Sequence, residues 1–246
     1  MKILITGGRG SLGRLVEPIL EDHEVQIGSR TARNEGQVRF DLADPATIER
    51  AVVGIQVVIH LATDPFHSDV EIEGSRALFA AVQEAGLQHL VFVSIVGIDA
   101  HPYPYYRTKL AIEDSLTTSD VPWTILRATQ FHSLVPRFVD GLRRSPIMPV
   151  PTGVRLQPID PVLVARRVAE LVSAGPAGRV EDMGGPEVLE LGEMVRDYLA
   201  VAKRRRLVVP VPLWGGAVEA FRRGDVLTDR VVPGGRTYRE FLAEAL

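Results

Sequence analysis

The sequence contains no cysteine among its 246 residues. This excludes disulfides, thiolate metal ligands and cysteine nucleophiles, and it leaves the redox compartment open. Lysine is also scarce, because only Lys2, Lys109 and Lys203 occur and arginine carries nearly all the positive charge. A lysine that lies within a functional motif is therefore stronger evidence for a functional role here than in a lysine-rich chain.

Several other signals are missing as well. No apolar run is long enough to span a bilayer, and no signal-peptide pattern precedes the apolar run that starts at Lys2, so we expect a cytoplasmic protein without a membrane partner. The net charge of −3 gives no indication of a nucleic-acid partner. The six histidines show no metal-ligand spacing, so no metal is predicted. The Gly-x-Ser-x-Gly motif of many hydrolases is absent.

The strongest positive signal is the stretch from Lys2 to Gly13. Lys2 to Thr6 is apolar and β-branched, which predicts a buried parallel strand, and apolar residues then recur at helical spacing up to Leu20. Glycines between a strand and a helix let the backbone approach a phosphate at the helix N-terminus. A plain tight turn is the alternative interpretation. The residues predicted to hold a pyrophosphate are Gly7, Gly10, Ser11, Leu12 and Gly13.

Strands and helices alternate through the first two thirds of the chain. Further strands are expected at 24–28, 38–40, 56–61, 89–94 and 123–127, and helices at 45–53, 70–85, 105–116, 130–144 and from Asp160-Pro161 onward. This order predicts an α/β fold, a Rossmann-type doubly wound parallel sheet. Residues 146–157 are expected to be irregular, with a short strand near 154–157.

The tail is more densely punctuated by glycine and proline. Its expected elements are strands at 179–183 and 207–211 and helices at 191–201, 214–223 and 238–245. We predict a cofactor-binding core over 1–150, to which 158–176 contributes, and a small interleaved C-terminal substrate subdomain over 177–246. The whole is expected to form effectively one compact unit.

The second strand ends without an acidic residue. In a dinucleotide-binding fold, the residue at this tip meets the adenosine ribose, and a cofactor without a 2′-phosphate favours Asp or Glu there. Here Ser29 and Arg30 follow the strand, and Arg33 lies close by. Because guanidinium groups suit a phosphate, we predict NADP(H) rather than NAD. Solvated loop arginines are the alternative.

Polar and small residues follow the later strands, where ligands of open α/β sheets bind. Asp41 and Leu42 follow the third strand, Leu61, Ala62 and Thr63 follow the fourth, and Ser94 ends the fifth. Tyr105 and Lys109 come next and share one helical face, because they are four residues apart. Tyr106 is the alternative inward-facing residue of this helix.

These motifs together resemble the short-chain dehydrogenase/reductases, in their extended and atypical branch, and most closely the NmrA-like NAD(P)-binding proteins. The resemblance covers nearly the whole chain. It rests on Thr6-Gly7-x-x-Gly10-x-x-Gly13, Asp41-Leu42, Leu61-Ala62-Thr63, Tyr105-x-x-x-Lys109 and Asp160-Pro161. It implies that Asp41 and Leu42 meet the adenine, and that Leu61, Ala62 and Thr63 lie beside the cofactor.

The resemblance also implies a reaction. A free phenol has a pKa of ~10 and is a poor proton donor near neutral pH, and an ammonium group one helical turn away favours its ionised form. Tyr105 is accordingly expected to donate a proton, Lys109 to assist it and to hold the nicotinamide ribose, and Ser94 to stabilise the developing oxyanion. We predict an NADP(H)-dependent oxidoreductase that reduces a carbonyl or conjugated small molecule.

Weaker expectations concern the substrate and the partners. Gln130, His132 and Trp214 are candidates for the substrate pocket. The chain is expected to be a monomer or a homodimer. A non-catalytic NADP(H)-sensing NmrA-like regulator is the alternative function, and a nucleotide-sugar epimerase or dehydratase is a second one.

Overall fold

The computed structural model describes residues 1–142 and 145–245. They form two compact units, each made of separate stretches of chain. Unit 1 comprises Met1–Ser94, Pro104–Arg127 and Val164–Glu181. Unit 2 comprises Ile95–Tyr103, Ala128–Leu163 and the chain from Asp182 onward.

Unit 1 is built on a seven-stranded sheet in the order β3-β2-β1-β4-β5-β6-β9. The strands are β1 (Lys2–Thr6), β2 (Glu24–Ser29), β3 (Gln37–Arg39), β4 (Val57–His60), β5 (His89–Ile95), β6 (Trp123–Ala128) and β9 (Gly178–Arg179). β1 lies between β2 and β4 in parallel register, with Thr6 beside both Gly28 and His60. The predicted Rossmann-type parallel sheet is therefore confirmed.

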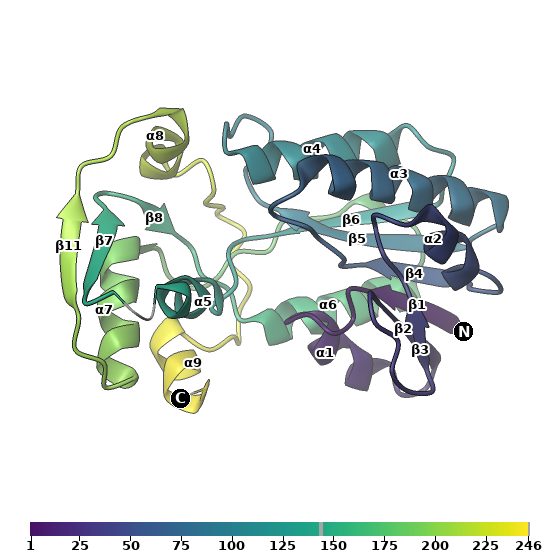
Figure 1. The fold of residues 1–246 in the computed structure, drawn as a ribbon, viewed down its shortest axis with the longest axis horizontal. Coiled ribbons are helices and arrows are strands. Elements are labelled where there is room, and N and C mark those ends of the chain that lie inside the picture. Colours follow the sequence, from purple (N-terminus) through teal and green to yellow (C-terminus); the bar gives the residue numbers. More distant parts are fainter. Residues whose placement is uncertain (143–144, 246) are drawn as a thin grey trace. The chain divides into compact units, whose positions relative to one another are not determined.

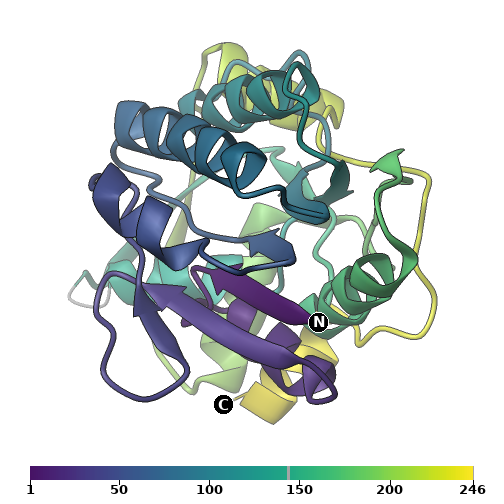
Figure 2. The same ribbon diagram turned by 90° about the vertical axis from the view of Figure 1, so that its right-hand side faces the viewer.

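Helices cover both faces of this sheet. Figure 1 shows α3 and α4 on one face and α1 and α6 on the other, and in Figure 2 the purple strand β1 runs between the blue helix α3 and the purple helix α1. The helices are α1 (Gly13–Val16), α2 (Pro45–Ala51), α3 (Ser68–Glu84), α4 (Pro104–Thr117) and α6 (Pro161–Ala174). Asp160 caps α6, since its Oδ1 accepts the Val162 N–H at 3.0 Å.

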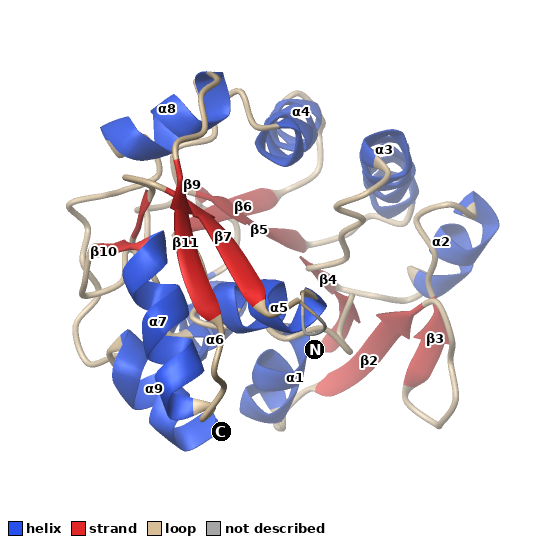
Figure 3. Cartoon of the chain, turned by 60° about the vertical axis from the view of Figure 1, so that its left-hand side comes forward, coloured by secondary structure: helices blue, strands red, loops and turns tan. Residues whose placement is uncertain are grey.

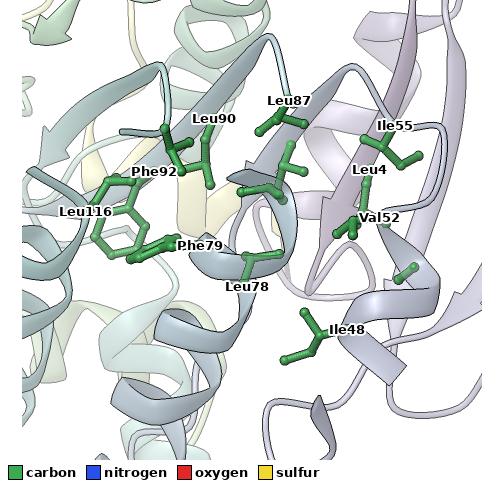
Figure 4. Packing of buried hydrophobic residues seen from close by; sticks show 14 of the residues in the cluster. Leu4, Ile48, Val52, Ile55, Leu78, Phe79, Leu87, Leu90, Phe92 and Leu116 are labelled. Carbon is green, nitrogen blue, oxygen red and sulfur yellow. The ribbon is translucent and has the colours of Figure 1, made fainter. Parts of the chain in front are cut away.

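The core of unit 1 lies between the sheet and the helices α2, α3 and α4. Figure 4 shows Leu4, Leu90 and Phe92 of the strands facing Leu78 of α3 and Leu116 of α4. All five side chains are fully buried. Burial of each such side chain contributes roughly 1.5–3 kcal/mol to the stability of the fold, so this layer fixes the strands against the helices.

Unit 2 contains two small sheets and the remaining helices. β7 (Ile147–Pro151) pairs in parallel with β11 (Leu207–Val211), and β8 (Arg155–Leu156) pairs antiparallel with β10 (Leu189–Glu190). Its helices are α5 (Leu134–Gly141), α7 (Leu191–Val201), α8 (Gly216–Arg223) and α9 (Tyr238–Ala245). Figure 3 shows β7 and β11 side by side, with α7 next to them and α9 beside α7.

Three local expectations differ from the structure. The first helix has only four α-helical residues and continues as a 3₁₀ turn over Glu17–Leu20, because Pro18 lacks an N–H donor. Residues 147–151, expected to be irregular, form β7 by pairing with a strand about sixty positions away. The helix expected over 130–144 spans Leu134–Gly141, and residues 143 and 144 lie outside the described residues.

Residues 95–103, 128–142 and 145–150 belong to unit 2, although they were expected in the cofactor-binding core. After β6 the chain pairs with other parts of this unit, since the Thr129 N–H donates to the Met183 carbonyl at 2.9 Å and the His132 N–H to the Ile159 carbonyl at 3.1 Å. These backbone bonds tie the segment to unit 2.

Candidate active site

The glycine turn after β1 is closely packed backbone. Gly7 has a φ of +64°, and a Cβ there would lie 2.7 Å from the backbone nitrogen of Ala62. A Cβ on Gly13 would lie 2.4 Å from the Cα of Gly8. The Gly10 N–H donates to the Gly7 carbonyl at 2.8 Å and closes the turn. Only glycine fits at Gly7 and Gly13, as a phosphate-binding turn requires.

The turn also presents backbone donors. Within the described part of the chain, the N–H groups of Ser11, Leu12 and Gly13 have no hydrogen-bond acceptor. Leu12 is buried and anchors the turn, whereas Ser11 is exposed. Free N–H groups at a helix start bind anions, so this arrangement fits the pyrophosphate of a dinucleotide.

The tip of β2 carries polar and basic side chains. The Ser29 hydroxyl donates to the Thr31 carbonyl at 2.8 Å, and Arg30 and Arg33 are exposed. Arg9 of the glycine turn reaches the same loop, with Nη1 at 3.3 Å from both oxygen atoms of Thr31. Arg9 was not among the residues predicted to bind the cofactor. Its place within the glycine motif, between Gly8 and Gly10, could have indicated this position.

The segments after β3 and β4 are held at the same edge of the sheet. The Asp41 N–H donates to the Thr47 hydroxyl at 3.0 Å, and the Leu42 carbonyl lies against Gly74 of α3, where a Cβ would approach it to 2.4 Å. The N–H groups of Leu61 and Ala62 donate to the Thr6 hydroxyl at 3.1 and 3.2 Å. These hydrogen bonds fix the segment after β4 beside the glycine turn.

Tyr105 and Lys109 lie together on α4. The Tyr105 hydroxyl is 3.1 Å from Thr63 Oγ1, and Lys109 Nζ lies 5.6 Å from the centre of the Tyr105 ring. Tyr105 is half-buried, whereas the alternative residue Tyr106 is buried in the core. The structure therefore brings together three of the predicted residues, and Tyr105 is the tyrosine that retains access to solvent.

Lys109 is buried against Glu71, an acidic residue that was not among the predicted site residues. Its Nζ lies 2.8 Å from Glu71 Oε1 on α3, and both side chains are almost completely buried. Burial lowers the pKa of Lys109, but attraction to Tyr105 and Glu71 outweighs it, so the pKa is raised above its ordinary value. The signal in the sequence was that Glu71 lies seven residues before Leu78, on the buried stripe of α3.

Ser94 lies near the end of β5 and is 4% exposed. Its Oγ has no hydrogen-bond partner within the described residues. A buried hydroxyl without a partner is costly, which makes this atom a candidate to meet a ligand. The expected role in stabilising an oxyanion stays a prediction.

The three residues predicted for the substrate pocket belong to unit 2. Gln130 Oε1 accepts the Gln157 N–H at 3.2 Å, while Gln130 Nε2 is buried without a partner among the described residues. The fully buried His132 donates from Nε2 to the Arg236 carbonyl at 2.9 Å. Trp214 is 80% exposed. Their contribution to a pocket stays a prediction.

Among the described residues, no group of three or more His, Asp or Glu side chains is arranged to hold a metal ion. No helix within residues 1–142 and 145–245 combines the length and the apolar character needed to cross a membrane.

Comparison with known proteins places the chain in a family. Residues 7–135 match a family described as NAD(P)H-binding. The (4-alkanoyl-5-oxo-2,5-dihydrofuran-3-yl)methyl phosphate reductase of Streptomyces griseus is 31% identical over 215 residues, which cover 82% of this chain and 74% of that protein. The 2-alkyl-3-oxoalkanoate reductase of Stenotrophomonas maltophilia is 29% identical over 256 residues, covering 84% and 77%.

The fold has solved counterparts. The triphenylmethane reductase of Citrobacter sp., solved with NADP(H), superimposes with a TM-score of 0.79 over the full length of both chains, at 17% identity. At this level of identity, the likeness shows only that the folds agree. The assignment to a family rests on the sequence matches described above. The chain thus belongs to the NAD(P)H-binding family of atypical short-chain dehydrogenase/reductases and is an NAD(P)-dependent oxidoreductase.

Proposed function

We propose that the chain is an NADPH-dependent reductase of a carbonyl or carbonyl-conjugated small molecule, with Tyr105 as the proton donor. The observation that carries this proposal is the pair of Tyr105 and Lys109 beside Thr63 at the carboxyl end of β4. The two sequence relatives described above, both named as reductases of oxygenated acyl compounds, support the same substrate class.

The cofactor has a site of matching chemistry. The pyrophosphate is assigned to the turn from Gly7 to Gly13, and the 2′-phosphate to Ser29, Arg30 and Arg33 together with Arg9. The side of the cofactor that carries the adenine is assigned to Asp41 and Leu42, and the nicotinamide side to Leu61, Ala62 and Thr63. Reduced nicotinamide supplies a hydride when bound.

The chain's own residues handle the proton. As a carbonyl carbon accepts a hydride, its oxygen becomes negative and needs a proton. The half-buried Tyr105 hydroxyl donates this proton, and the Lys109 ammonium stabilises the phenolate left behind. The Ser94 hydroxyl, which has no hydrogen-bond partner among the described residues, donates a hydrogen bond to the same substrate oxygen.

The test is single-turnover oxidation of NADPH, followed at 340 nm, with a panel of 2-alkyl-3-oxo acids, acylated butenolides and quinones. For any substrate that reacts, Tyr105→Phe is expected to lower the rate at least about 100-fold, the range of general acid catalysis. Tyr106→Phe is the matched control, because the neighbouring ring is buried in the core, and it is expected to retain the rate.

Three results contradict the proposal. An unchanged rate in Tyr105→Phe removes the proton-donor role. Tight NADPH binding without turnover on any member of the panel favours the non-catalytic NADP(H)-sensing regulator. Release of tightly held NAD on denaturation favours the epimerase or dehydratase.

A further inference from the structure

Glu71 carries a buried carboxylate beside the proposed catalytic pair, Tyr105 and Lys109. Its side chain has no solvent exposure, and Oε1 lies 2.8 Å from Lys109 Nζ. Oε2 accepts two hydrogen bonds, from Thr63 Oγ1 at 2.8 Å and from the Asp64 N–H at 2.7 Å. A buried charge is costly unless it is paired and hydrogen-bonded, and Glu71 is both.

The chemistry of these groups sets the direction of the hydrogen bonds. An ionised carboxylate only accepts, so Thr63 donates its one hydroxyl proton to Glu71. The Thr63 oxygen is then an acceptor toward Tyr105, and the 3.1 Å contact is a hydrogen bond donated by the phenol. Glu71, acting through Thr63, thus fixes the position of the Tyr105 hydroxyl oxygen.

A second chain of hydrogen bonds fixes Glu71 itself. The Ser75 hydroxyl donates to the Glu71 carbonyl at 2.7 Å, so Ser75 Oγ must accept from His60 Nε2 at 3.1 Å. His60 Nδ1 then accepts from the Thr6 hydroxyl at 2.8 Å. Thr6 directly precedes the glycine turn, so the position of Glu71 is tied to the end of β1.

We propose that Glu71 is a positioning residue, whose carboxylate holds the Lys109 ammonium and, through Thr63, the Tyr105 hydroxyl in a single arrangement. This rests on the proposed function, because Tyr105 and Lys109 are the reacting pair of that proposal. Glu71 balances the charge of Lys109 and, through Thr63, holds the hydroxyl of Tyr105, the proton donor of that proposal. The family resemblance, by contrast, implies a role in assisting Tyr105 only for Lys109 and none for Glu71.

The first test reads Lys109 directly and needs no substrate. The chain has only three lysines, so a sample labelled with [ε-¹³C]lysine gives three signals, and Lys109→Arg assigns the buried one. The groups facing Lys109 are Glu71 on α3, His60 on β4, Phe92 on β5 and Tyr105 on its own helix.

In Glu71→Gln, the titration midpoint of the Lys109 signal is expected to fall by at least about one pH unit, because a buried ammonium loses its counter-charge. Glu73→Gln is the matched control, since Glu73 lies on the exposed side of α3 and pairs with Arg76. An unchanged Lys109 midpoint in Glu71→Gln overturns the proposal.

The second test separates positioning from folding. Thr63→Val removes the link to Tyr105 without changing a buried charge, and it is expected to lower kcat roughly tenfold or more while the KM for the carbonyl substrate changes less than about threefold. Glu71→Gln is expected to do the same, and Glu71→Asp to restore part of the loss. Unchanged kcat in Thr63→Val overturns the Tyr105 part of the proposal.

Failure of the proposed function is distinguishable from failure of this inference. If wild-type protein reduces no substrate, the proposed function fails, and the Lys109 midpoint still decides whether Glu71 holds the ammonium. If Glu71→Gln does not fold, the titration is made in Glu71→Asp, where a displaced carboxylate is also expected to lower the midpoint.

Discussion

The buried ring of His60 makes the stability of this protein depend on pH in a calculable way. The ring is 1% exposed, stacks on Phe92 and bonds to Thr6 and Ser75 through its two nitrogens. Burial, and then the charge of Lys109, lowers its pKa from 6.5 to about 3. Protonation would give Nδ1 a hydrogen and break the bond that it accepts from Thr6.

The sign and size of the effect follow from linkage. The unfolded ring binds a proton as the pH falls below 6.5, whereas the folded ring stays neutral down to about 3. The contribution of His60 to stability is therefore complete above pH 6.5 and is lost as the pH falls toward 3. Between pH 7 and pH 5, this ring alone removes about 2 kcal/mol from the free energy of unfolding.

The assay is urea unfolding followed by circular dichroism at pH 7 and at pH 5. In His60→Gln, the decrease in the free energy of unfolding between these pH values is expected to be about 2 kcal/mol smaller than in wild type. Contributions from other groups, including His89, whose burial lowers its pKa to about 4, are common to both proteins and cancel. His23→Gln is the control. Equal decreases in His60→Gln and wild type would refute the reasoning.

Two further predictions concern the cofactor and the anchoring of α4. Joint replacement of Arg9 and Arg30 by glutamine is expected to raise the Kd for NADPH at least roughly tenfold and that for NADH much less, because guanidinium groups pair with phosphate; equal losses in nicotinamide fluorescence titrations would contradict the assignment. Glu113→Gln is expected to lower the free energy of unfolding by about 3 kcal/mol, because it breaks a buried ion pair with Arg127 at 2.6 Å. Glu170→Gln, in an exposed pair on α6, is expected to cost less than about 1 kcal/mol, and a similar cost at both positions would disprove the argument.

Much of the fold was accessible from the sequence, because its signals are local. The strand at Leu207–Val211 and the helix at Tyr238–Ala245 have the predicted bounds, and α6 begins at Pro161, directly after Asp160, where a helix was expected. β7 was not predicted, because two prolines in five residues argue against a strand. It forms because it pairs in parallel with β11, a strand that lies far along the chain.

The sequence by itself determined the glycine turn, the basic tip of β2 and the spacing of Tyr105 and Lys109, because each depends on residues within one element or one turn. Only the tertiary structure decided what surrounds that pair. Thr63 and Tyr105 are 42 positions apart, and Glu71 comes from a third element. Their contacts depend on how α3 and α4 pack on the sheet. Because a buried charge is costly unless it is paired, this packing matters most for Glu71, which it pairs with Lys109 and joins through Thr63 to Tyr105.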